Sequence, residues 1–207
     1  MMPRKHVVIT GTGRTGTTFL VQVLAELGFD TGAGSEDPWK RIDKNARAGI
    51  ENNIRVSNAP YIIKSPAFSV YVHDVLERED IEIEHIYIPM RDLAAAAESR
   101  RYVVREVLEG TSSVRPSQIP GGLVGTDDPK KQEVYLLNVI YHLLFHVSKT
   151  QIPVTLLMYP RLVQDYEYLY KKLVPILQDK VHHDDFVNAF QKVVRPDWVH
   201  HFTDQDR

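Results

Sequence analysis

The N-terminal part of the chain joins a short apolar run, a glycine-rich turn and an amphipathic helical pattern in direct succession. The run Val7–Ile9 is β-branched, which favours a buried strand. Apolar residues recur with helical spacing from Phe19 to Leu27, and Gly28 is placed to end that helix. Backbone N–H groups of such a loop and of the helix N-terminus converge where the helix dipole favours negative charge. The sequence therefore predicts a site for a phosphate-like anion.

The P-loop of kinases and NTPases fits this turn only in part. Its pattern is G-x-x-x-x-G-K-[ST]. Gly11, Gly16 and Thr18 match, but Thr17 occupies the position of the phosphate-binding lysine. A small-molecule kinase that uses ATP and Mg²⁺ stays as an alternative, with Asp92 as its candidate metal ligand.

The dinucleotide pattern G-x-G-x-x-G is complete in Gly11, Gly13 and Gly16. A dinucleotide-binding oxidoreductase also needs an acidic ribose ligand at the end of a second strand, about 20 residues further on. Asp30 lies near that place, although Phe29–Thr31 is at most a short strand. This class is the second alternative.

A third pattern places a cation inside the loop and hydroxyls after it. Residues 14–18 read Arg-Thr-Gly-Thr-Thr and match [KR]-[ST]-G-T-[TS] at all five positions. They resemble the 5′-phosphosulfate loop of sulfotransferases, which bind 3′-phosphoadenosine 5′-phosphosulfate (PAPS). The residues that the resemblance assigns to this co-substrate are Gly13, Arg14, Thr15, Gly16, Thr17 and Thr18.

A second segment, residues 88–99, resembles another signature of the same family, in which a strand ends in arginine and a serine follows eight residues later. Arg91 and Ser99 have this spacing, and the resemblance implies that they bind the 3′-phosphate. The chemistry agrees, because a guanidinium makes bidentate phosphate contacts and a hydroxyl adds one more. Leu93 stands where family members often have proline.

The resemblance spans residues 6–177 in order, but only these two motifs are specific. The Arg-Lys-Gly element that many cytosolic members use against the nucleotide is missing. Arg195, Arg100 or Arg101 could take its place.

Residues 63–68 are similar to the Lys-[ST]-Pro segment of several bacterial and carbohydrate sulfotransferases. This likeness implies that Lys64 acts beside the sulfuryl group together with Arg14. The general base has no clear signature; Glu36 and Asp37, in a loop expected to face the acceptor, are the candidates. The implied reaction moves a sulfuryl group from PAPS to a hydroxyl or amine, releases 3′,5′-ADP and needs no metal. A non-catalytic nucleotide-binding protein on the same fold is a further alternative.

Strand and helix patterns alternate along the whole chain, with later strands expected at 61–64, 84–90 and 154–158. This order predicts an α/β fold of three layers, a P-loop NTPase-like arrangement with a central parallel sheet of about four to five strands flanked by helices. Ligands of such folds lie beyond the carboxyl ends of the strands, where Lys64, Arg91 and Tyr159 fall.

Residues 1–207 are expected to form a single domain, with segments 32–57 and 109–130 as mobile parts of the acceptor side. Residues 39–55 are predicted to form a polar surface or lid helix with few core residues. A long helix at about 129–150 is expected to bury one apolar stripe. The stripe consists of Val134, Leu137, Ile140, Tyr141, Leu144 and Val147.

Composition excludes few classes of protein. The formal net charge is −2, which gives no reason to expect nucleic-acid binding. No apolar run approaches the roughly 18 residues of a membrane span. The first strand starts too early to leave room for a signal peptide, so a cytoplasmic location is the default expectation. The chain has no cysteine, hence no disulfide and no thiolate metal site. The acceptor and the oligomeric state have no signature in the sequence.

Overall fold

Strands and helices alternate through the part of the chain that the computed structural model describes, which is residues 2–33, 49–109 and 114–199. The strands are β1 (Arg4–Ile9), β2 (Ile62–Lys64), β3 (Ile81–Met90) and β4 (Val154–Met158). The α-helices are α1 (Thr17–Glu26), α2 (Phe68–Leu76), α3 (Leu93–Leu108), α4 (Gln132–Val147), α5 (Tyr166–Leu177) and α6 (His183–Val193). Short 3₁₀ turns are η2 (Pro116–Gln118), η3 (Pro129–Lys131), η4 (Arg161–Val163), η5 (Gln178–Lys180) and η6 (Pro196–Trp198).

The strands form one parallel sheet in the order β2-β1-β3-β4. The predicted α/β fold with a central parallel sheet is therefore confirmed, and the four strands found among the described residues lie within the expected number. Because all strands run the same way, their carboxyl ends meet at one edge of the sheet. The loop after β1, the end of β2 and the start of α3 all lie at this edge.

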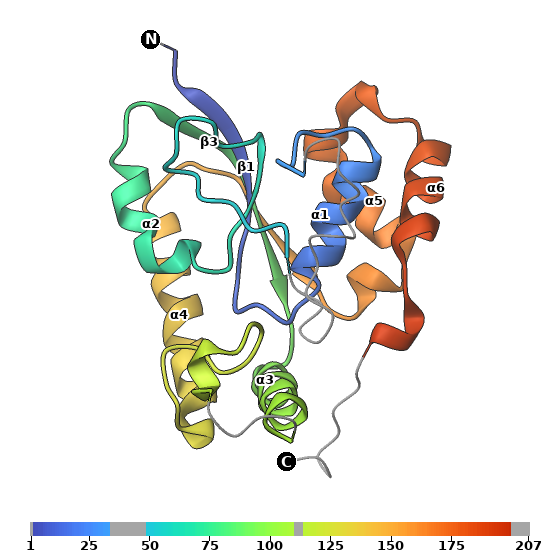
Figure 1. Cartoon of the computed structure of the whole chain (residues 1–207). Helices are drawn as coiled ribbons and strands as arrows, with labels where there is room; N and C mark the ends of the chain where they lie inside the picture. The colour runs from blue at the N-terminus through green and yellow to red at the C-terminus, as the bar shows by residue number, and fades with distance from the viewer. Residues whose placement is uncertain (1, 34–48, 110–113, 200–207) are drawn as a thin grey trace.

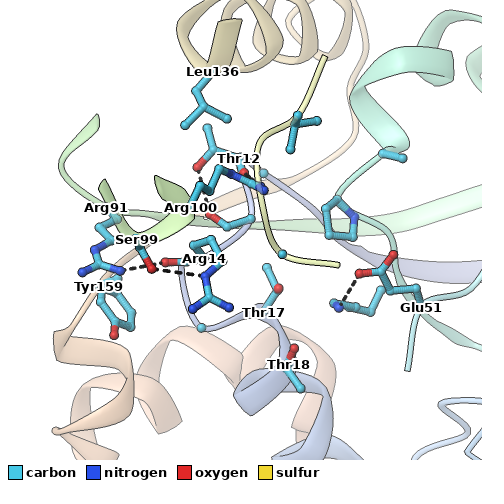
Figure 2. Close-up of a pocket in the computed structure, with 18 of the residues that line it drawn as sticks. Thr12, Arg14, Thr17, Thr18, Glu51, Arg91, Ser99, Arg100, Leu136 and Tyr159 are labelled. Carbon is cyan, nitrogen blue, oxygen red and sulfur yellow. Dashed lines mark hydrogen bonds and ion pairs between the residues drawn. The ribbon is translucent and has the colours of Figure 1, made fainter. Parts of the chain in front are cut away.

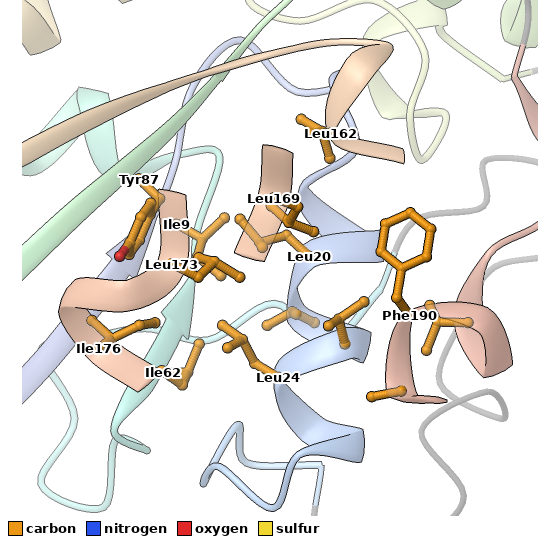
Figure 3. Packing of buried hydrophobic residues seen from close by; sticks show 14 of the residues in the cluster. Ile9, Leu20, Leu24, Ile62, Tyr87, Leu162, Leu169, Leu173, Ile176 and Phe190 are labelled. Carbon is orange, nitrogen blue, oxygen red and sulfur yellow. The ribbon is translucent and has the colours of Figure 1, made fainter. Parts of the chain in front are cut away.

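Helices cover both faces of the sheet, which gives three layers (Figure 1). Val7 and Ile9 of β1 point to the face covered by α1, α5 and α6, where Leu20 and Phe190 join the same core (Figure 3). Val8 points to the opposite face, covered by α2 and α4. Since β1 is buried on both faces, it appears in the sequence as a continuous apolar run.

The predicted short strand at Phe29–Thr31 does not form. The Asp30 carbonyl accepts a hydrogen bond from the Ile62 N–H (2.8 Å), and its carboxylate accepts one from the Tyr61 N–H (3.3 Å). These contacts tie the segment to the start of β2 at one point. Gly32 then has a left-handed backbone conformation (φ +69°), which turns the chain away from β2 and ends the pairing of backbone hydrogen bonds with this strand.

The predicted lid helix over residues 39–55 is wrong at its C-terminal end, and residues 39–48 lie outside the described residues. Residues 49–55 contain no helix. Ile50 and Ile54 are buried in the cores on opposite faces of the sheet. The Asn52 N–H donates to the Lys64 carbonyl (2.9 Å), so tertiary contacts with β2 replace the helical hydrogen bonds.

Helix α4 forms as predicted, but only Ile140 and Val147 of the predicted apolar stripe are buried. Its buried apolar residues are Leu136, Ile140, Leu143 and Val147. Of the predicted stripe, Val134, Leu137 and Tyr141 are 61%, 52% and 68% exposed. The helix is apolar on two sides, and packing against α2 and α3 selects the side that is buried. None of the helices within the described ranges combines the length and the apolar character needed to cross a membrane.

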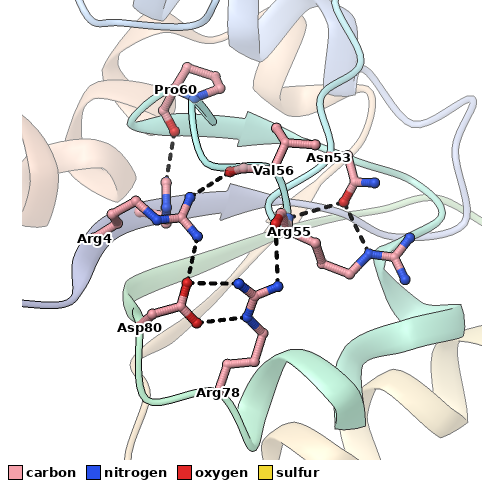
Figure 4. Close-up of polar contacts among 8 residues, drawn as sticks. Arg4, Asn53, Arg55, Val56, Pro60, Arg78 and Asp80 are labelled. Carbon is pink, nitrogen blue, oxygen red and sulfur yellow. Dashed lines mark hydrogen bonds and ion pairs between the residues drawn. The ribbon is translucent and has the colours of Figure 1, made fainter.

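A polar network fixes the opposite end of the sheet (Figure 4). Asp80, just before β3, accepts hydrogen bonds from Arg78 (2.7 and 2.8 Å) and Arg4 (2.9 Å), which hold the pKa of its carboxyl well below the usual range. Arg4 also donates to the Val56 carbonyl (2.6 Å). The network joins β1, β3 and the segment before β2.

His6 of β1 makes the stability of this fold dependent on pH. Its ring is buried, and Nδ1 lies 2.7 Å from the Pro60 carbonyl, to which the neutral ring donates. Burial lowers the pKa of His6 below its ordinary value of 6.5. The unfolded state then binds more protons between the two pKa values, so stability is lost as the pH falls below about 6.5.

We expect the free energy of unfolding to fall between pH 7.5 and pH 5.5, and to fall less in His6→Asn, whose amide can donate to Pro60 but cannot take up a proton. Urea denaturation at both pH values measures this difference. An equal fall in both proteins would contradict the assignment.

Candidate functional site

The loop between β1 and α1 has the geometry of an anion site. Gly13, Arg14 and Gly16 take positive φ angles of 69°, 58° and 85°, which turn the chain sharply before the helix. Gly16 is the N-cap of α1, and the first N–H groups of a helix have no acceptor within the helix. The hydroxyls of Thr17 and Thr18 lie at this helix end (Figure 2). The loop therefore offers backbone donors, hydroxyls and one arginine to an anion.

The two sequence motifs meet at this loop (Figure 2). Arg91 follows β3, and its Nη1 donates to the Arg14 carbonyl (3.1 Å). Arg14 Nε donates to the hydroxyl of Ser99 on α3 (3.1 Å). The Asp92 carboxylate accepts from the Ala95 N–H (2.8 Å) and so caps α3, as predicted. Residues 77 and 85 positions apart in the chain thus form one cluster.

A cavity of about 430 Å³ opens over this cluster. The predicted site residues that line it are Gly13, Arg14, Gly16, Thr17, Thr18, Lys64, Arg91 and Ser99. Thr15 is not among the lining residues; it is fully buried, and its hydroxyl has no hydrogen-bond partner within the described part of the chain. Glu36 and Asp37, the predicted candidates for a general base, lie outside the described residues.

Lys64 ends β2 with its side chain only 1% exposed. Its Nζ donates to a carboxylate oxygen of Glu51 (2.9 Å) and to the Gly49 carbonyl (2.9 Å). Burial lowers the pKa of the Lys64 ammonium, the charge of Glu51 opposes this shift, and the charge of Arg14 adds to it. Glu51 lines the cavity and stays 55% exposed. Sequence reasoning missed Glu51, because no local pattern distinguishes it from other polar residues of its segment.

Arg100, the residue after Ser99, is a buried cation that also lines the cavity. Its Nη1 donates to the Gly122 carbonyl (2.7 Å) and its Nη2 to the Thr12 carbonyl (2.6 Å). Within the described residues no carboxylate forms an ion pair with it, and its Nε has no partner. Burial lowers the pKa of Arg100 to about 10, and the charge of Arg14 adds to this shift. Arg100 therefore joins the glycine loop to residues 117–125.

The other arginines proposed as nucleotide contacts have different positions. Arg101 does not line the cavity; it pairs with Glu98 and Glu133 at 3.0 Å each. Arg195 lines the cavity together with Trp198. Arg91 and Tyr159 also line the cavity, and the guanidinium of Arg91 lies 4.8 Å from the ring centre of Tyr159.

The cavity is rich in positive charge. Among the residues that the structure describes, the charged ones that line it are Glu51, Arg14, Lys64, Arg91, Arg100 and Arg195. Five cations and one carboxylate suit a ligand with several negative charges. In the described ranges, no group of three or more His, Asp or Glu side chains is arranged to hold a metal ion.

The contact between Gly13 and Arg100 can be tested with a matched pair of substitutions. A Cβ on Gly13 (φ +69°) would lie 2.5 Å from Nη2 of Arg100, whereas a Cβ on Gly28 (φ +83°) would meet no atom within 4 Å. Both Gly→Ala variants incur the cost of a left-handed backbone, about 1–2 kcal/mol. Gly13→Ala should lose roughly 1.5–3 kcal/mol more in chemical denaturation, because it displaces the charged hydrogen bonds of Arg100. Equal losses would mean that Arg100 does not hold the loop.

Comparisons with known proteins place few limits on the function. The chain is similar to a solved structure, the sulfotransferase domain from the Synechococcus PCC 7002 olefin synthase, with 15% sequence identity over 97% of this chain and 84% of that one and a TM-score of 0.48. No model of a known protein family matches the chain, and no curated protein matches it. An identity and a TM-score this low do not transfer an activity, so the function must be inferred from the geometry of the cavity.

Proposed function

We propose that this protein is a sulfotransferase that uses PAPS as its sulfuryl donor. The observation that carries the proposal is the contact between the two motifs. The carbonyl of Arg14 accepts a hydrogen bond from Arg91 Nη1 (3.1 Å), and Arg14 Nε donates one to the Ser99 hydroxyl (3.1 Å). The residues that the two motifs assign to the 5′- and the 3′-phosphate are thus direct neighbours. A nucleotide with phosphate at both its 5′ and 3′ positions would require this arrangement.

The loop and α3 would divide the two phosphates between them. Backbone N–H groups of residues 13–18 and the hydroxyls of Thr17 and Thr18 are suited to the 5′-phosphate. Arg91 and Ser99 are suited to the 3′-phosphate, with Arg91 held by the Arg14 carbonyl and by the ring of Tyr159. Asp30, which a dinucleotide site would need, does not line the cavity; its carboxylate accepts from the N–H groups of Gly32 and Tyr61.

The reaction would take place between Arg14, Lys64 and Glu51. PAPS supplies an activated sulfuryl group: the new bond forms between the acceptor oxygen and sulfur, and the bond from sulfur to the 5′-phosphate oxygen breaks, leaving its electron pair on 3′,5′-ADP. Arg14 and Lys64 offset the negative charge that develops on the leaving oxygen. Glu51 is suited to take the proton from the hydroxyl of the acceptor substrate, because its side chain lines the cavity. Lys64 holds this carboxylate in place, with 2.9 Å between Lys64 Nζ and one Glu51 oxygen.

Binding of 3′,5′-ADP tests the nucleotide site directly. In calorimetric titrations with EDTA present, we expect the protein to bind 3′,5′-ADP but neither NAD nor ATP with comparable affinity. Arg91→Ala should weaken binding roughly ten- to hundredfold, since a charge-assisted hydrogen bond contributes about 1.5–3 kcal/mol. The matched control is Arg105→Ala, an arginine of α3 that does not line the cavity. Binding of ATP only with added Mg²⁺, and no binding of 3′,5′-ADP, would favour the kinase instead.

Replacement of Glu51 tests the proposed base. Glu51→Gln should lower kcat for 3′,5′-ADP release from PAPS about 10²-fold or more, with 3′,5′-ADP binding nearly unchanged. The loss should be smaller with 4-nitrophenol than with 4-methylphenol as acceptor, because the more acidic phenol needs less help to lose its proton. Glu133→Gln is the control, since Glu133 is also ion-paired but lies outside the cavity. An equal loss with both phenols would mean that Glu51 acts only by positioning Lys64.

A further inference from the structure

Part of the cavity has a wall of a different character. The start of α2, residues 117–125 and the first turns of α4 contribute to this wall. Figure 2 shows Leu136 of α4 on the far side of Thr12 and Arg100 from Thr17 and Thr18. Among the described residues, seven apolar side chains line this wall: Ala67, Val70, Ile119, Leu123, Val124, Leu136 and Val139.

Polar groups are few on this wall. Its polar side chains within the described residues are the hydroxyl-bearing Ser69, Ser117 and Tyr135, and none of them carries a charge. The two cations that border it are already engaged with the protein. Lys64 contacts Glu51 and Gly49, and Arg100 contacts two backbone carbonyls.

Contacts within the protein hold the wall in place. Leu123 and Ile119 are only 2% and 5% exposed, because they also pack against Val103 and Val104 of α3. The Val124 N–H donates to the side chain of Gln132 (2.8 Å), which holds residues 117–125 on α4.

On the α2 side, Nδ1 of His142 lies 2.8 Å from the Ser69 carbonyl, which fixes the start of α2 against α4. A ligand therefore meets a fixed apolar surface next to Lys64 and Glu51.

We infer that the acceptor is an uncharged, apolar alcohol or phenol. This inference rests on the proposed sulfuryl transfer. Its hydroxyl proton passes to Glu51, and its oxygen forms the new bond to sulfur as the bond from sulfur to the 5′-phosphate breaks. Burial of the apolar part against this wall favours binding. A sugar would bury several hydroxyls against carbon, and each unpaired hydroxyl costs about tenfold or more in affinity.

Val70 allows this wall to be changed without disturbing the core. It is the third residue of α2 and is 63% exposed while lining the cavity. Val134 is the third residue of α4, is 61% exposed and does not line the cavity. Since both lie in the first turn of a helix, where a carboxylate is tolerated, Val70→Asp and Val134→Asp form a matched pair.

The experiment measures binding of 1-hexanol, 2-naphthol and glucose to the protein saturated with 3′,5′-ADP, followed by saturation-transfer NMR and calorimetry. We expect both apolar alcohols to bind at least tenfold more tightly than glucose. Val70→Asp should weaken their binding about tenfold, and Val134→Asp should leave it unchanged. The rate of 3′,5′-ADP release from PAPS should likewise be higher with the two apolar alcohols as acceptors than with glucose.

Two results would overturn the inference while the proposed function stands. One is that glucose binds as tightly as the apolar alcohols, or that these do not bind although 3′,5′-ADP does. The other is that the two aspartate variants behave alike. Failure of 3′,5′-ADP to bind in the first step would instead reject the proposed function itself.

Discussion

The positive charge gathered at the carboxyl edge of the sheet is the constraint on which the functional part of this structure depends. Arg14, Lys64, Arg91 and Arg100 lie around one cavity, and Glu51 is the carboxylate among its described lining residues. Buried cations are costly unless dipoles or opposite charges compensate for the lost water. Here much of the compensation comes from backbone carbonyls: that of Arg14 for Arg91, and those of Thr12 and Gly122 for Arg100. The net charge of −2 gives no indication of this local field.

These contacts also couple the parts of the cavity. Arg100 holds the glycine loop with one end of its guanidinium and residues 117–125 with the other. The glycine loop and the apolar wall are therefore held in one fixed geometry, which the proposed in-line transfer between two bound substrates would require. Gly13 permits this contact, because any larger residue would occupy the space of the guanidinium. A glycine of the sequence motif thus also lets Arg100 approach the loop.

The fold was predictable where one element has one dominant pattern. Val7–Ile9 is continuously apolar because both faces of β1 are covered, and Asp92 caps α3 through a hydrogen bond to a residue three positions away. Prediction failed where the pattern allowed two answers. Helix α4 is apolar on two sides, and only its packing on α2 and α3 decides that Leu136 and Leu143 are buried while Val134 and Leu137 are exposed. Residues 49–55 do not form a helix. They lie beside the end of β2, where the Asn52 N–H donates to the Lys64 carbonyl, a partner that is distant in the sequence.

The sequence by itself determined the glycine-rich loop and the α/β order, because both depend on local chemistry: glycines at left-handed positions, a helix that starts directly after them, and strand patterns that alternate with helical ones. It also marked Arg91 and Ser99 by their spacing within one strand and helix. Only the tertiary structure decided that these residues meet Arg14 across 77 and 85 positions, that Glu51 pairs with Lys64, and that Arg100 bonds to Thr12 across 88 positions. Such contacts form only when several strands end at one edge of a sheet, and no pattern within a single segment encodes them.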